Sequence, residues 1–91
     1  MDYEPGFLQY PQINLNGTDA LDLARQYFDA AKAVERAANL QANILHGRDY
    51  QTLPHEAYMR AKNDMLDRQK KLIEVYNDLM RIGENCVSQE R

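Results

Sequence analysis

The sequence predicts an all-α protein in which two long helices form an antiparallel hairpin behind an extended N-terminal arm. In two segments, about 19–46 and about 54–82, apolar residues recur at steps of three and four, as on the buried face of an amphipathic helix. The connection between them, residues 47–54, is short enough to make the two helices antiparallel neighbours. Residues 1–17 are instead interrupted by prolines and glycines, which are not compatible with a continuous helix.

Length and composition exclude several classes of function. With 91 residues the chain forms one domain at most, and two helices alone cannot enclose a thick core, which favours association with another protein surface. Its 11 basic and 14 acidic side chains give a net charge of −3, which is the wrong sign for a protein that coats nucleic acid or an anionic membrane. No apolar run approaches the roughly 20 residues of a membrane span. We therefore expect a protein partner, either a second copy or another chain.

The first residues bear on the cellular location. They are acidic and are broken by Pro5 and Gly6, and the first basic residue is Arg25. A cleavable signal peptide needs a basic segment followed by an apolar one, so we expect none here. The expected locations are the cytoplasm, a virion or a secretion assembly.

Residues 1–17 form the predicted arm. Ile13 and Leu15 alternate with polar residues, which suits an extended strand. The arm has too many large apolar side chains for a segment that stays in water, and we predict that they lie in a protein interface: Tyr3, Phe7, Leu8, Tyr10, Ile13 and Leu15. Besides simple disorder, two interpretations stay open. The arm folds back onto its own hairpin, or it docks along a neighbouring subunit through its spaced side chains.

The helical hairpin is predicted over residues 18–83, and its first helix over about 19–46. Thr18 or Asp19 is a suitable N-cap, and Gly47 stands where a left-handed residue often ends a helix. Many of the apolar positions are alanines. Such small side chains allow a second helix to approach closely.

The second helix is predicted over about 54–82, with Gly83 as its stop and residues 84–91 as a polar tail. Its apolar residues form two neighbouring stripes. The first stripe is expected to pack on the first helix: Tyr58, Ala61, Met65, Leu72, Val75, Leu79 and Ile82. The second stripe is expected to face a protein partner: Met59, Leu66, Ile73, Tyr76 and Met80. Arg68 and Gln69 interrupt both stripes at one level, and polar residues inside a helical seam can set register and partner choice.

The polar side of this second helix carries oppositely charged residues four positions apart. Three pairs have the spacing of helix-supporting ion pairs: Glu56 with Arg60, Asp64 with Arg68, and Asp67 with Lys71. The basic residues around Lys70 alternate with these acidic ones, which predicts a solvated helix face.

No catalytic constellation, cofactor site or metal site is predicted. His46 and His55 flank the turn, but their spacing matches no compact ligand motif, so we interpret both as surface residues at helix ends. Cys86 is the one cysteine, and no histidine is placed by sequence to activate it. We therefore expect a protein that is not an enzyme.

The layout resembles the small hairpin subunits that polymerise into type III secretion needles. The resemblance covers roughly residues 18–82 and consists of an irregular N-terminus, a helix, a short turn with proline and a second helix. Two short matches accompany it: Gly17-Thr18-Asp19 and Asp78-Leu79-Met80. The chain departs from this pattern after Gly83, where a polar tail with a cysteine is predicted.

Two classes of function are consistent with these features. The first is a structural or assembly subunit that packs its hairpin into a larger complex and uses the arm to clasp a neighbour. The alternative is a soluble helical binding module, such as a secretion chaperone, an adaptor or an inhibitor, that covers one specific protein partner.

Overall fold

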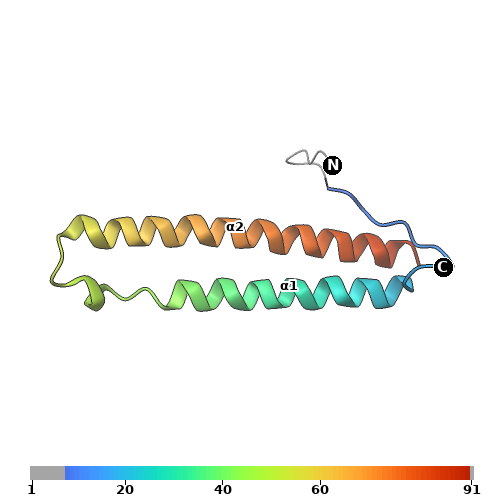
Figure 1. Cartoon of the computed structure of the whole chain (residues 1–91), viewed down its shortest axis with the longest axis horizontal. Coiled ribbons are helices and arrows are strands. Elements are labelled where there is room, and N and C mark those ends of the chain that lie inside the picture. Colours follow the sequence, from blue (N-terminus) through green and yellow to red (C-terminus); the bar gives the residue numbers. More distant parts are fainter. Residues whose placement is uncertain (1–7, 91) are drawn as a thin grey trace.

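The computed structural model describes residues 8–90 and shows an all-helical hairpin, as predicted (Figure 1). Helix α1 spans Ala20–Asn43, a short 3-10 helix η1 spans Gly47–Tyr50, and helix α2 spans His55–Ser88. The two α-helices lie side by side and run in opposite directions, which gives a rod with extents of 61 × 26 × 17 Å.

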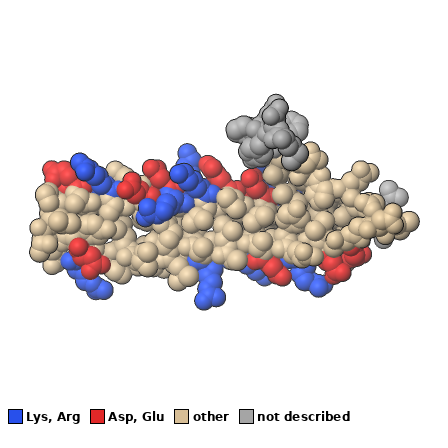
Figure 2. All heavy atoms as spheres, in the orientation of Figure 1, with Lys and Arg blue, Asp and Glu red and all other residues tan. Residues whose placement is uncertain are grey.

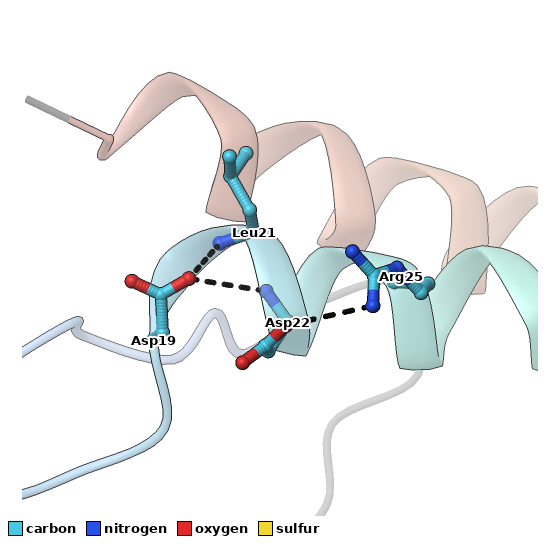
Figure 3. Close-up of polar contacts among 4 residues, drawn as sticks. All are labelled: Asp19, Leu21, Asp22 and Arg25. Carbon is cyan, nitrogen blue, oxygen red and sulfur yellow. Dashed lines mark hydrogen bonds and ion pairs between the residues drawn. The ribbon is translucent and has the colours of Figure 1, made fainter.

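Asp19 caps the N-terminus of α1, one of the two predicted positions. Its Oδ2 atom accepts hydrogen bonds from the backbone N–H groups of Leu21 and Asp22, at 3.2 and 3.4 Å (Figure 3). These groups have no partner inside the helix, so the carboxylate satisfies them and also carries the charge that the helix dipole favours. One turn later, Asp22 lies 3.6 Å from the Arg25 guanidinium.

The predicted end of α1 near His46 is wrong by three residues. The helix ends at Asn43, and Gly47 begins η1 instead of adopting a left-handed cap. The chain leaves the helix early and brings Tyr50 against Tyr58 of α2, with ring centroids 5.8 Å apart in an edge-to-face arrangement. This aromatic contact lies between residues of different elements, so helix-end rules do not account for it.

Small side chains form the contact between α1 and α2. The buried residues of α1 are Ala20, Ala24, Ala31 and Ala38, and those of α2 are Gly83 and Cys86. Larger apolar residues such as Val34 and Leu72 are only half-buried along the edges of this seam. The hairpin therefore has a narrow core, as the alanine-rich face predicts.

Helix α2 does not stop at Gly83 but continues to Ser88. The prediction of a polar tail over 84–91 is therefore wrong for residues 84–88. Gly83 is buried against α1, and a Cβ atom at this position would lie 2.5 Å from Cε1 of Phe28. The missing side chain makes room for the aromatic ring. A helical glycine costs about 1 kcal/mol relative to alanine, which a packed neighbouring helix readily offsets. The same helix then carries Cys86 into the buried seam.

The arm runs beside the C-terminal half of α2, on the side away from α1 (Figure 1). Gln89 holds it: its Nε2 atom donates to the carbonyl of Pro11 at 2.8 Å, and its Oε1 atom accepts from the N–H of Ile13 at 2.9 Å. Farther back, Nη2 of Arg81 lies 3.4 Å from the hydroxyl of Tyr10. Residues 10–13 of the arm thus fold back onto the hairpin of the same chain.

A turn at Asn14–Gly17 leads from the arm to α1. The N–H of Gly17 donates to the carbonyl of Asn14 at 3.2 Å, and the Asn14 side chain accepts from the N–H of Asn16 at 2.9 Å. The structure has no strand within residues 8–90, so the alternation of Ile13 and Leu15 does not mark one.

Candidate protein-interaction surface

The second stripe predicted for α2 is largely exposed. Met59, Leu66 and Ile73 keep 40%, 50% and 47% of their surface accessible. Tyr76 and Met80 are half-buried. Tyr76 lies seven residues before the buried Gly83, so it is on nearly the same side of α2 as the contact with α1. It therefore fits the partner-facing stripe less well than Met59, Leu66 and Ile73 do.

These exposed residues belong to a series that is longer than the predicted second stripe. Because α2 continues to Ser88, Val87 joins the helix and is 43% exposed. Apolar residues then recur at strict seven-residue intervals along nearly the whole helix. We call this set the heptad stripe: Met59, Leu66, Ile73, Met80 and Val87. Seven residues make almost two turns, so successive members are offset by only about 20° and the five side chains form a stripe that winds slowly around the helix.

The contact with α1 and the described contacts of the arm lie on other sides of α2 than Leu66 and Ile73, the exposed centre of the heptad stripe. The α1-facing side of α2 is marked by Leu72, Leu79 and Gly83, and Ile73 is rotated from Leu72 by about 100°. A third side carries four half-buried residues spaced by four, three and four, and Gln89 places the arm on it. These residues are Asp78, Ile82, Asn85 and Gln89.

Two residues of the stripe predicted to pack on α1 are therefore assigned differently by the structure. Ile82 lies on the arm-covered side of α2, and Val75 is 46% exposed. Around the axis of α2, both residues are rotated by about 60° or more from the centre of the contact with α1. At this angle the narrow alanine surface of α1 no longer reaches them.

The predicted interface residues of the arm divide into three groups. Leu8, Tyr10 and Ile13 are half-buried, whereas Leu15 at the turn is fully exposed. Tyr3 and Phe7 lie outside the described residues. Leu15 is thus the described arm residue that remains free for a neighbour.

The polar residues that interrupt both stripes find a partner across the seam. Nε2 of Gln41 donates to Oε1 of Gln69 at 2.7 Å and to the carbonyl of Met65 at 3.3 Å. Nε of Arg68 donates to Oε1 of Gln41 at 3.2 Å. A polar group inside a helix pair is costly unless it is hydrogen-bonded, so this pairing favours one register of the hairpin. Beside it lies an open hollow of about 290 Å³ near the turn.

Charge is distributed unevenly along α2. Residues 55–71 include five basic and three acidic side chains, and residues 72–88 include one basic and three acidic side chains. The two halves of the helix therefore carry net charges of +2 and −2. On the face shown in Figure 2, the basic side chains along the upper edge gather over the half of α2 nearer the turn.

The three ion pairs predicted on the polar side of α2 do not form within the described part of the chain, where Asp22 and Arg25 make an ion pair instead. Exposed side chains of this kind stay solvated, because ordering two long side chains offsets the weak attraction in water.

Chemically reactive groups are sparse. His46 and His55 are both exposed. Burial of Cys86 raises the pKa of its thiol, which disfavours the reactive thiolate. Between residues 8 and 90, no three potential metal-ligating side chains come together, and neither helix is long and apolar enough to cross a membrane.

No family model, curated protein or solved structure matches this chain. The similarity to needle subunits therefore remains a similarity of layout.

Proposed function

We propose that this protein is a non-enzymatic structural subunit that packs its helical hairpin into a larger complex through the heptad stripe of α2. The observation that carries the proposal is the line of exposed apolar side chains along one side of α2. Isolated exposed apolar residues are common, but an aligned series is typical of helix-packing surfaces. Covering each half-exposed Leu or Ile contributes on the order of 1 kcal/mol.

The narrow core supports the same proposal. Alanines and a glycine form the buried seam between α1 and α2, so the hairpin gains little from burying large side chains internally. A further helix packed on α2 supplies the missing burial. Small hairpins commonly gain stability by such association.

The arm has a smaller part in this proposal than the sequence alone indicates. Its residues 10–13 are held by Gln89 and Arg81 of the same chain. Leu15 lies in the turn before α1, is fully exposed, and is available to clasp a neighbouring subunit.

Substitution of Ile73 by aspartate tests the proposal. Ile73→Asp places an unpaired charge in the middle of the stripe, so we expect it to abolish association while circular dichroism still shows a helical chain. Asn39→Asp is the matched control, because it adds the same charge at an exposed polar position of α1, outside the stripe. Sedimentation of both variants and the parent chain over a range of concentrations measures the effect.

Leu72→Ala provides the opposite control. Leu72 lies beside the α1 seam and is half-buried, so we expect about 2 kcal/mol less folding stability. Ile73→Asp that associates like the parent would contradict the proposed role of the stripe. A parent chain that stays monomeric at all concentrations would favour the binding module, with a different protein covering the stripe.

A further inference from the structure

We infer that the occupant of the heptad stripe is a second copy of this chain, with the two α2 helices antiparallel and Ile73 on the two-fold axis. This inference rests on the proposed function and specifies its partner. Two features of α2 carry it: the spacing of the stripe and the charge difference between the two halves of the helix.

The stripe matches itself under such a two-fold rotation. An axis perpendicular to α2 at Ile73 brings Leu66 opposite Met80 of the second copy and Met59 opposite Val87. Ile73 meets its own counterpart. The five apolar residues therefore contact one another along about 42 Å of helix, at 1.5 Å per residue. This is the isologous contact that closes a symmetric dimer.

The charges of α2 select the antiparallel orientation. The half nearer the turn carries +2 and the C-terminal half carries −2. Packed helix axes lie about 8–10 Å apart, which is close to the Debye length at physiological salt, so these charges still interact. An antiparallel pair places opposite charges together at both ends. A parallel pair places like charges together, and it also aligns the two helix dipoles unfavourably.

Individual positions beside the stripe agree with this register. On the flank away from α1, Asn63 comes opposite Glu84 of the second copy, and Lys70 comes opposite Asn77. Each pair joins a charged group to an amide, and no like charges meet on this flank. All four residues are exposed in the single chain and are free to make these contacts.

The described contacts of the arm lie away from the centre of this dimer. Gln89 binds Pro11 and Ile13 on the side of α2 that carries Ile82, which is rotated by more than about 100° from Ile73. The hydroxyl of Tyr10 lies 3.4 Å from Arg81, which is rotated by about 80° from Ile73. A second copy therefore reaches Ile73 without displacing these contacts.

Disulfide cross-linking tests both the partner and the orientation. Ile73→Cys should form covalent dimers under mild oxidation, because the two sulfur atoms meet across the axis. Leu66→Cys alone should cross-link several-fold less, because its counterpart lies about 21 Å away along the helix pair. A mixture of Leu66→Cys and Met80→Cys chains should restore the cross-link. The parent chain gives the background, since its Cys86 is fully buried.

Salt dependence is an independent measurement. The dissociation constant of the dimer, measured by sedimentation, should rise with salt because the attraction between opposite charges is screened. Association accompanied by equal self-cross-linking at Leu66→Cys and Ile73→Cys indicates a parallel pair. That result overturns the inference and leaves the proposed assembly function standing, as does association without any cross-link at Ile73→Cys. A chain that remains monomeric overturns both.

Discussion

Substitution of Gly83 by alanine tests how closely the two helices pack. A Cβ atom at this position would lie 2.5, 2.8 and 3.0 Å from Cε1, Cδ1 and Cζ of Phe28. Ordinary van der Waals contact begins near 3.4 Å, so the Cε1 edge of the ring must move by about 0.9 Å. The ring is rigid, and it moves only by rotating the whole side chain outward or by separating the helices.

Two opposing effects set the magnitude. Alanine is about 1 kcal/mol more favourable than glycine inside a helix. Inserting a methyl group into a tight contact costs about 1–3 kcal/mol. Phe28 is half-buried, so the ring can partly swing towards solvent, which places the cost in the lower part of this range. We expect Gly83→Ala to lower the free energy of unfolding by up to about 1 kcal/mol, in spite of the better helix former.

A double-mutant cycle with Phe28→Ala, followed by urea unfolding, separates the two effects. Without the ring, only the helix propensity remains, and Gly83→Ala should then stabilise the chain by about 1 kcal/mol. The sign of the effect thus depends on residue 28. If Gly83→Ala stabilises the parent chain as much as it stabilises the Phe28→Ala chain, the close approach does not determine the choice of glycine and the reasoning is refuted.

Three further predictions concern stability. Asp19→Ala should lower the unfolding free energy by about 0.5–2 kcal/mol, because it removes the helix cap. Asp19→Asn should lower it by much less, since asparagine also caps a helix. Equal losses of stability in thermal unfolding would contradict this prediction. Gln41→Ala and Gln69→Ala should show a coupling of about 0.5–1.5 kcal/mol in a double-mutant cycle, and additive effects would exclude their pairing. Burial raises the pKa of the Cys86 thiol, so folding stability should be complete below about pH 8.5 and fall as the pH rises above it. Cys86→Ala should remove that decrease in urea unfolding, and an unchanged pH profile would contradict the assignment.

The helices were predictable because their signals are local. Apolar periodicity identifies both, and the carboxylate of Asp19 caps α1 where a capping residue was expected. Gly83 was misread because a glycine after an apolar series is a common stop signal. Residue 83 is a glycine because the ring of Phe28 packs against it. Phe28 is distant in sequence, and only the antiparallel packing of the helices brings it to this position.

The interaction surface was predictable in part for the same reason. Met59, Leu66 and Ile73 follow from helical spacing alone, and the structure leaves them exposed. Val87 was missed because the predicted helix ended too early. The arm contact was not predictable, because a glutamine such as Gln89 in a polar segment carries no local sign that it holds a distant backbone.

The alanine seam has a consequence for the alignment of the two helices. Ala24, Ala31 and Ala38 repeat every seven residues, so sliding one helix by seven residues places alanine where alanine was before. Such a repetitive surface defines the spacing of the helices without defining their offset. Gln41 and Gln69 remove the ambiguity, because a slip of one heptad separates them and leaves their amides unpaired at a cost of about 1–3 kcal/mol. The glutamine pair thereby favours the same offset as the close fit of Phe28 against Gly83.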